Sequence, residues 1–269
     1  MGVVYEATET ATGRRAALKT LSTELARDPG LRERFLREAR VGMALHHPNI
    51  VEVYEAGDAN GQPYLAMEYL DGMDLEKLLR ATELSLEWKV DLLRQVCEGL
   101  AHAHEHGVVH RDVKPGNIWV KPGGELKMVD FGLARVSHST LTERGVVLGS
   151  VHYMAPEQIE GGVVDHRADI FSVGAIAYEL LAGRKPFDGT TLTAVMLRIT
   201  QGPPDVSALS RTAYSPGLEA LVMRALATRP VDRYASLTDM RRDLRRVVQE
   251  RVGASAAAGH PAGILRPEA

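Results

Sequence analysis

The chain has 269 residues, of which 45% are hydrophobic and 25% are charged, and its formal net charge at pH 7 is −3. A chain of this size can bury a sizeable core in one large domain or in two lobes that share a cleft. The small negative charge gives no reason to expect a nucleic-acid partner, and no apolar run approaches the roughly 20 residues that span a bilayer. The N-terminus lacks the pattern of a secretion signal, so a cytoplasmic location is expected.

The chain begins with a glycine-containing turn that leads into a strand. Met1 to Ala7 contains Gly2 followed by Val3-Val4-Tyr5, and valine and tyrosine favour strands. A second short strand is predicted from Ala16 to Lys19. The first part of the chain therefore starts as a small sheet.

A helix and two more strands follow. Leu31 to Leu45 has the apolar spacing of an amphipathic helix. Ile50 to Gly57 and Tyr64 to Tyr69 are predicted strands, joined by the turn signal Asp58-Ala59-Asn60-Gly61. From Leu75 onward the patterns are nearly all helical, which predicts an α+β fold with its strands concentrated at the start of the chain.

The helical pattern from Val90 to Ala103 contains Cys97, the only cysteine. No intrachain disulfide can form, and we expect a buried, unreactive thiol. His102, His104 and His106 lie at the end of this pattern, and the i, i+4 spacing of the first and last could suit zinc. We reject a metal site, because no glutamate follows the first histidine in an H-E-x-x-H order.

The centre of the chain carries His110-Arg111-Asp112-Val113-Lys114-Pro115-Gly116-Asn117 and, thirteen residues after Asn117, Asp130-Phe131-Gly132. An Ala155-Pro156-Glu157 triplet comes later. Phosphoryl transfer needs a base that orients a hydroxyl, a cation that offsets charge, and oxygen ligands for magnesium. Four residues are of the right types for these roles: Asp112, Lys114, Asn117 and Asp130. The order and spacing of the motifs resemble those of eukaryotic-type serine/threonine protein kinases of the bacterial branch.

The resemblance covers about residues 2 to 252 and implies the two-lobe protein-kinase fold. It predicts a truncated, β-rich N-lobe at 1–67 without its first strand, a hinge at 68–73, a large helical C-lobe at 74–252, and an Ala/Gly/Pro linker-like tail at 253–269. In the family a G-x-G-x-x-G loop covers the ATP phosphates, and Gly2 alone matches it here. We expect either a truncated N-terminus or a chain that starts at an internal methionine of a longer protein.

The resemblance also assigns the nucleotide contacts. Lys19 is expected to reach the phosphates, held by an ion pair with Glu38, and Glu33 is the competing partner. Gly42, one helical turn after Glu38, stands where the family usually has an apolar side chain stacked on Phe131, so we expect a gap there. The other residues expected to bind ATP, by side chain or backbone, are Gly2, Val4, Ala17, Met67, Glu68 and Leu70.

In the catalytic loop the resemblance gives Asp112 the role of the base and makes Lys114 the cation that stabilises the transferring phosphoryl group. Asn117 and Asp130 would hold Mg²⁺. A lysine two residues after the aspartate is characteristic of kinases that act on serine and threonine. Protein serine and threonine hydroxyls are therefore the expected acceptors.

The stretch from Phe131 to Glu157 has the length and hydroxyl content of an activation segment. Thr142 is the first candidate for phosphorylation, with Thr140 and Ser139 as further candidates, and Arg111 would pair with the added phosphate. Any one of these hydroxyls could equally be an ordinary polar loop residue.

Other matching positions are expected to be structural. Asp169 would accept backbone amides of the catalytic loop, and Arg233 would pair with Glu157. The hydroxyl of Ser150 could bond toward the catalytic loop. The complete set of expected structural residues is His110, Phe131, Ser150, Glu157, Asp169 and Arg233.

The last helical pattern is basic. An apolar stripe runs from Leu237 to Val247, and four arginines accompany it, namely Arg241, Arg242, Arg245 and Arg246. Such a helix could bind a membrane surface or a calmodulin-type partner. We favour a solvated face on the final helix of the large lobe.

The sequence thus predicts a serine/threonine protein kinase that uses ATP and Mg²⁺ to phosphorylate protein substrates and itself, with regulation by phosphorylation of the activation segment. No nucleic-acid partner and no membrane segment in this chain are expected. The alternative is a kinase-like binding or regulatory module with little turnover. It is favoured by the incomplete glycine-rich loop, because missing backbone amides would weaken phosphate binding.

Overall fold

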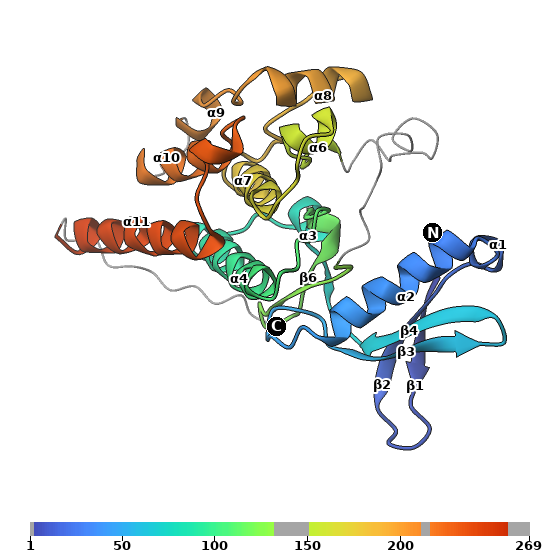
Figure 1. Cartoon of the computed structure of the whole chain (residues 1–269). Helices are drawn as coiled ribbons and strands as arrows, with labels where there is room; N and C mark the ends of the chain where they lie inside the picture. Colours follow the sequence, from blue (N-terminus) through green and yellow to red (C-terminus); the bar gives the residue numbers. More distant parts are fainter. Residues whose placement is uncertain (1–2, 132–150, 211–215, 258–269) are drawn as a thin grey trace.

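Two lobes make up the protein in the computed structural model, which describes residues 3–131, 151–210 and 216–257 (Figure 1). The small lobe is built on a four-stranded antiparallel sheet, and the large lobe is mainly helical. The α+β, two-lobe architecture expected from the sequence is therefore confirmed. The precise lobe and hinge boundaries stay predictions.

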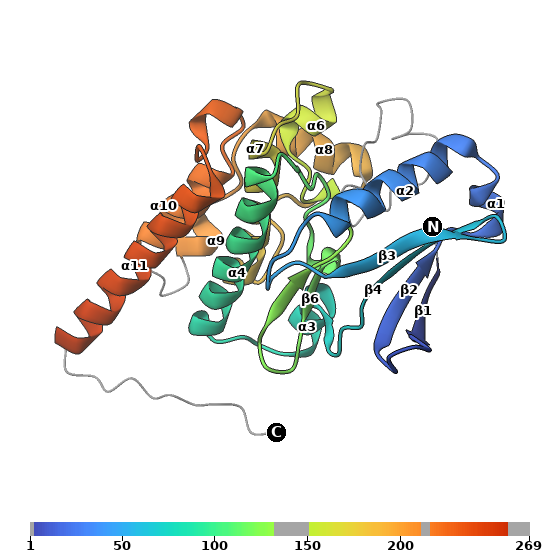
Figure 2. The ribbon, with the colours of Figure 1, turned by 60° about the horizontal axis from the view of Figure 1, so that its bottom comes forward.

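The small-lobe sheet has the strand order β1-β2-β4-β3. The helix α2 packs against β3 and β4 and covers one face of the sheet (Figure 2). The elements of this lobe are β1 (Val3–Thr8), β2 (Arg15–Thr20), α1 (Thr23–Ala26), α2 (Pro29–Met43), β3 (Val53–Ala59) and β4 (Gln62–Glu68).

Helix α2 begins earlier than the apolar pattern predicts, because a cap precedes the first apolar residue. The Asp28 carboxylate accepts the backbone N–H groups of Gly30 and Leu31 at 2.9 and 3.2 Å, and Pro29 occupies the first turn, where its missing N–H costs nothing. The hairpin turn between β3 and β4 is centred on Asn60 and Gly61, both with positive φ (55° and 82°). Residues with positive φ are typical of two-residue hairpin turns.

Strand β3 begins at Val53 and not at Ile50. The register shifts between Val53 and Glu55, which marks a bulge or irregularity. Ile50 instead forms a parallel bridge with Met128 in the large lobe. An apolar run such as Ile50-Val51 does not reveal whether it extends a strand or anchors a loop, so the predicted boundary was wrong by three residues.

The large lobe is organised around two long helices, α4 and α7, which pack against each other. Helix α7 is buried along nearly its whole length, and α11 runs beside α4 (Figure 1). A small sheet of order β5-β6-β7 lies next to α4. The elements of this lobe are β5 (Met73–Asp74), α3 (Leu75–Ala81), α4 (Leu86–Glu105), η1 (Pro115–Asn117), β6 (Ile118–Val120), β7 (Leu126–Met128), α6 (Pro156–Glu160), α7 (Arg167–Ala182), α8 (Leu192–Gln201), α9 (Ser207–Ser210), α10 (Pro216–Ala225), η3 (Pro230–Asp232) and α11 (Leu237–Ala257).

Helix α11 continues to Ala257, five residues into the stretch predicted to be linker. The stretch is rich in alanine, the residue with the highest intrinsic helix propensity, and this outweighs Gly253. On the exposed face of α11, Arg241, Arg242 and Arg246 pair with acidic residues of the same lobe. None of the helices in the described ranges is both long and apolar enough to cross a bilayer.

The Cys97 thiol lies fully inside the large lobe. Burial raises the pKa of this thiol to about 12, because a thiolate is poorly solvated in apolar surroundings. The expected burial of the cysteine is confirmed, and a lack of reactivity stays a prediction.

A buried ion pair joins α6 to the segment before α11. The Arg233 guanidinium is 0% exposed and donates to both Glu157 oxygens at 2.7 Å. Its remaining N–H groups donate to the carbonyl oxygens of Ala227, Arg167 and Thr228 at 2.8 to 2.9 Å. All five guanidinium donors are thus satisfied, which offsets the cost of burying the charge.

Replacing Glu157 with glutamine should lower the free energy of unfolding by about 3 to 5 kcal/mol, because the buried Arg233 charge loses its counter-ion while the side-chain volume hardly changes. Urea denaturation measures this. The control is Glu76→Gln, which breaks an exposed pair with Arg80 and should cost less than about 1 kcal/mol. Equally small losses in free energy of unfolding in the two variants would show that the buried pair contributes no more to stability than the exposed pair.

Three histidine rings join the loop after α2 to the end of α4. The rings of His47 and His102 lie 5.0 Å apart, and those of His102 and His106 lie 4.4 Å apart. The His47 Nδ1 accepts the backbone N–H of Asn49 at 3.0 Å. Burial and then the charge of His102 lower the pKa of His47; Lys127 and Arg241 lower it further, and Glu98 opposes them.

Because the pKa of His47 is lower in the folded chain than its usual value near 6.5, the unfolded chain binds the proton more readily. The contribution of His47 to the free energy of unfolding should therefore be fully present above about pH 6.5. It should fall as the pH drops below that value, until His47 is protonated in the folded state too. In His47→Asn the side chain still offers an acceptor to Asn49 but cannot titrate. Its free energy of unfolding should fall less steeply between pH 7.5 and 5.5.

Chemical denaturation across that pH range provides the measurement. The control is His46→Asn, which removes an exposed histidine from the same loop. A slope in His47→Asn as steep as that of the wild type would refute the assignment.

Candidate active site

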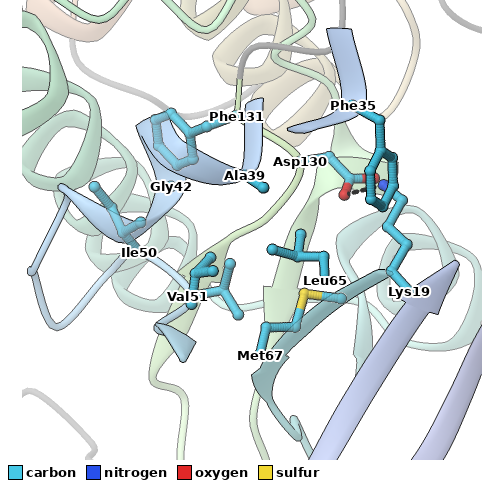
Figure 3. Close-up of a pocket in the computed structure, with 11 residues that line it drawn as sticks. Lys19, Phe35, Ala39, Gly42, Ile50, Val51, Leu65, Met67, Asp130 and Phe131 are labelled. Atoms are coloured by element: carbon cyan, nitrogen blue, oxygen red, sulfur yellow. Dashed lines mark hydrogen bonds and ion pairs between the residues drawn. The ribbon is translucent and has the colours of Figure 1, made fainter. Parts of the chain in front are cut away.

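Lys19 on β2 and Asp130 after β7 meet although 111 positions separate them in the sequence. The Lys19 Nζ lies 2.6 Å from Asp130 Oδ1, and the two side chains are 14% and 30% exposed. Figure 3 shows the lysine reaching from the sheet to this carboxylate. Partial burial makes such a charge-assisted hydrogen bond stronger than one in water. The small lobe is thereby connected directly to the motif of the large lobe.

The expected Lys19–Glu38 pair stays a prediction. Glu38 lies in α2, and its side chain is outside the described part of the structure. Two other α2 residues, Phe35 and Ala39, line the same hollow as Lys19. Helix α2 therefore faces the lysine, as the expectation requires.

The Asp112 carboxylate is held by two neighbours from its own loop. Its Oδ2 accepts from Lys114 Nζ at 2.7 Å and from Asn117 Nδ2 at 3.0 Å. The Asn117 amide also donates to the Asp112 carbonyl oxygen at 2.8 Å. The carboxylate is about a quarter exposed, so one side of it is reachable from solvent while the other is fixed.

Asn117 and Asp130 offer oxygen atoms that fit a divalent cation. The Asn117 nitrogen donates to Asp112, which leaves the Asn117 Oδ1 as the group of this side chain that can act as a ligand. The backbone carbonyl of Asn117 accepts the N–H of Val129 at 3.0 Å, and Val129 immediately precedes Asp130. A carboxylate and an amide oxygen are ligands of the kind that Mg²⁺ takes beside phosphates, and the bond from Val129 ties the backbones of the two segments together.

His110 fixes the two halves of the site relative to each other. It is fully buried. Its Nε2 donates to the Val129 carbonyl at 3.1 Å, and its Nδ1 accepts the N–H of Asp112 at 3.3 Å. Its ring centroid lies 4.7 Å from that of Phe131. One imidazole thus bridges the loop of Asp112 and the segment of Asp130.

The Asp169 carboxylate supports this arrangement from inside α7. It is 0% exposed and accepts the backbone N–H groups of His110 at 2.8 Å and Arg111 at 2.7 Å. His104 Nε2 donates to it at 2.8 Å. Arg111 has a φ of 66°, a left-handed conformation that costs a non-glycine residue roughly 1 to 2 kcal/mol. The Asp169 contact helps to hold it there.

Sequence reasoning considered His104 only as a possible metal ligand and missed this contact. A signal was present: His104 lies four residues after the buried Leu100, so it continues the apolar stripe of α4. A histidine at such a position needs a buried partner. Sequence reasoning also missed Gln158, whose Nε2 donates to the Arg111 carbonyl at 2.8 Å.

Three of the residues expected around the adenine, Ala17, Met67 and Leu70, belong to one apolar cluster. Met67 is buried with Val51 and Val53, and Ala17 and Leu70 pack against them. Val4 lies opposite Lys19 in the β1–β2 register and so shares a sheet face with Ala17. Val4 is 56% exposed.

Glu68 forms a further link between the lobes. Its carboxylate lies 2.8 Å from Lys127 Nζ of β7, and its backbone N–H donates to the Glu52 carbonyl. The side chain is thus directed to the large lobe, and the expected nucleotide contact through the backbone of Glu68 stays a prediction.

A hollow opens beside Gly42, between α2 and the sheet, and Figure 3 shows its lining. Phe131, Leu65 and Met67 are among the lining residues, so there is space next to Phe131 where the sequence led us to expect a gap. The space is closed on one side: a Cβ atom at Gly42 would lie 2.9 Å from Val53 Cγ2. Helix α2 therefore approaches β3 more closely than a larger residue at this position would allow.

Several expected residues lie outside the described ranges. They are Gly2, Ser139, Thr140, Thr142 and Ser150. The nucleotide role of Gly2 and the regulatory and structural roles of the four hydroxyls stay predictions.

Comparisons with known proteins identify the family of the chain. The family described as "Protein kinase domain" matches residues 1–244. A probable serine/threonine-protein kinase of Streptomyces coelicolor is 39% identical over 268 residues, which is 96% of this chain and 40% of that protein. Serine/threonine-protein kinase Pkn1 of Myxococcus xanthus is 40% identical over 270 residues, covering 98% of this chain and 39% of that protein. The chain thus spans about two fifths of the length of these relatives.

Solved structures give the same result. The crystal structure of the PknI kinase domain of Mycobacterium tuberculosis superimposes with a TM-score of 0.72 at 32% sequence identity, covering 92% of this chain and 91% of that domain. The family match, the relatives and the solved structures agree, and the chain belongs to the protein kinase domain family.

Proposed function

We propose that this domain transfers the γ-phosphoryl group of ATP to serine and threonine hydroxyls of proteins, including its own activation segment. The observation that carries the proposal is the convergence of Lys19 with Asp130, and of Lys114 and Asn117 on Asp112. These are the charged and amide groups that phosphoryl transfer requires. The relatives named as serine/threonine-protein kinases support the choice of acceptor.

In the proposed reaction the acceptor hydroxyl approaches the reachable side of the Asp112 carboxylate, which orients it and takes its proton. The hydroxyl oxygen forms a bond to the γ-phosphorus as the bond from phosphorus to the β,γ-bridging oxygen breaks, and ADP leaves with that electron pair. Lys114, whose Nζ is 2.7 Å from the Asp112 carboxylate, would offset negative charge on the transferring group. Lys19 would neutralise the nucleotide phosphates.

Asn117 and Asp130 would hold Mg²⁺, which supplies charge neutralisation to the phosphates when bound. Ala17, Met67 and Leu70 provide an apolar surface for the adenine ring. For regulation we propose that phosphate on Thr142, or on Thr140 or Ser139, pairs with Arg111, the residue before Asp112, and so controls the catalytic loop. A cytoplasmic location stays a prediction.

The competing proposal is a kinase-like binding module with little turnover. Within the described residues β1 pairs only with β2, so the strand that should shape the phosphate-binding loop has one open edge. Weak nucleotide retention would follow.

Replacing Asp112 with asparagine should reduce phosphoryl transfer about 10²- to 10⁴-fold, because the amide can no longer take a proton. Label from γ-labelled ATP with Mg²⁺ is followed on the chain itself and on a generic basic protein. Glu83→Gln, which removes an exposed carboxylate, is the control and should transfer at the wild-type rate. The affinity for ATP, measured separately by a thermal shift, should stay within a few-fold in Asp112→Asn.

Label that persists undiminished in Asp112→Asn would contradict the role of this residue. A wild-type chain that binds ATP but transfers no label would favour the binding module.

A further inference from the structure

We propose that Gln158 is a positioning residue: its side-chain amide fixes the peptide group between Arg111 and Asp112 and thereby directs the Asp112 carboxylate. The proposal rests on the proposed function, in which Asp112 receives the acceptor proton. Gln158 lies in α6, and 47 positions separate it from Arg111. No motif of the site includes it.

The backbone at Arg111 needs to be held from both sides. Its φ of 66° is unfavourable for a residue with a Cβ atom, and such conformations persist only when neighbouring groups determine them. On the amide side, Asp169 Oδ1 accepts the Arg111 N–H at 2.7 Å. On the carbonyl side, Gln158 Nε2 donates to the Arg111 oxygen at 2.8 Å.

The Arg111 carbonyl belongs to the same planar peptide group as the Asp112 N–H. That N–H is 3.3 Å from His110 Nδ1, a long contact. The bond from Gln158 is therefore the shorter of the two that set the orientation of this peptide plane. The Asp112 side chain leaves the backbone directly after the plane, so a rotation of the plane would move the carboxylate.

Gln158 itself is oriented by α6. Its Oε1 accepts the backbone N–H of Ala155 at 3.0 Å, as in a capping box. Exchanging the amide oxygen and nitrogen would place a donor against that N–H and an acceptor against the Arg111 carbonyl, so the contacts define the donor. The adjacent Glu157 is fixed by the buried pair with Arg233, which anchors the helix.

The plainer interpretation is that Gln158 only caps α6. The two roles use different atoms of one side chain, so they can be separated. Gln158→Glu keeps an oxygen that accepts the Ala155 N–H, since glutamate is as suitable as glutamine in a capping box. It loses the donor to Arg111 and places a negative oxygen against a carbonyl. Gln158→Met removes both contacts at similar volume.

The test measures kcat, the KM for ATP and the thermal unfolding midpoint of the wild-type chain and both variants. Gln158→Glu is expected to lower kcat roughly five- to tenfold, the effect of losing one ordinary hydrogen bond. The KM for ATP should stay within about twofold, because Asp112 does not hold the nucleotide, and the unfolding midpoint should match the wild type. Gln158→Met should lose kcat to a similar extent and should also lower the unfolding midpoint, because it removes the cap of α6 as well.

A Gln158→Glu variant with wild-type kcat, beside a Gln158→Met variant that loses stability, would overturn the proposal and leave the cap as the only role. If Gln158→Glu does not fold, Gln158→Met alone decides, and a kcat equal to that of the wild type in this variant would also overturn the proposal.

A readout independent of turnover separates this proposal from the proposed function. Amide hydrogen exchange of the segment 110–117 should accelerate in Gln158→Glu while exchange in α7 stays unchanged. If the wild-type chain transfers no phosphate, the proposed function fails, and the exchange result still decides whether Gln158 holds the loop. Unchanged exchange in that segment would overturn the positioning role.

Discussion

The buried carboxylate of Asp169 is the constraint on which the site depends. A charge without solvent contact inside a helical core is tolerated only when donors surround it, and here two backbone amides and the His104 ring supply them. These amides belong to His110 and Arg111, the two residues before Asp112. The hydrogen bonds that stabilise the buried charge therefore also fix the backbone from which the Asp112 side chain extends. The His104 Nδ1 is a buried atom for which the described residues provide no hydrogen-bond partner. The ring therefore bonds to Asp169 through Nε2 alone. The same hydrogen bonds thus stabilise the core and set the geometry of the loop.

From this centre the site extends in two directions. Toward the small lobe, His110 holds Val129 and hence Asp130, and Asp130 holds Lys19. Toward the outside of the large lobe, the Arg111 carbonyl meets Gln158 on α6, which the Arg233–Glu157 pair anchors. Both Arg111 and Asp130 have positive φ, at 66° and 60°. Both residues are proposed to act on phosphate or metal. Such unfavourable backbone conformations persist where the surrounding structure, and not local preference, determines the geometry. The large lobe contributes a rigid half of the site, and the small lobe contributes a lysine joined to it by one ion pair.

The sequence predicted the kinds of elements and the chemical groups better than it predicted their connections. Short motifs identified Asp112, Asn117 and Asp130 because order and spacing along the chain are local information. The start of β3 was wrong, since the apolar character of Ile50 serves an inter-lobe bridge. Helix α11 continues past Val252 into the alanine-rich stretch, because alanine favours a helix more than Gly253 opposes it. His104 was weighed for the wrong role, and Gln158 was not considered, because each acts on a partner that only the folded chain brings near. The contact of Lys19 with Asp130 is likewise beyond local reasoning, because it depends on how the two lobes meet.

The most direct measurement of the central claim is a crystal structure of the chain with Mg²⁺ and a non-hydrolysable ATP analogue. We expect Asn117 Oδ1 and the Asp130 carboxylate to lie about 2.0 to 2.1 Å from the cation, with Lys19 at the phosphates. Asp112 should lie beside the γ-phosphate. The amides of His110 and Arg111 should still rest on Asp169, because the loop is held before the nucleotide arrives. A cation bound without Asn117 and Asp130, or a catalytic loop that leaves Asp169 when the nucleotide binds, would contradict the account.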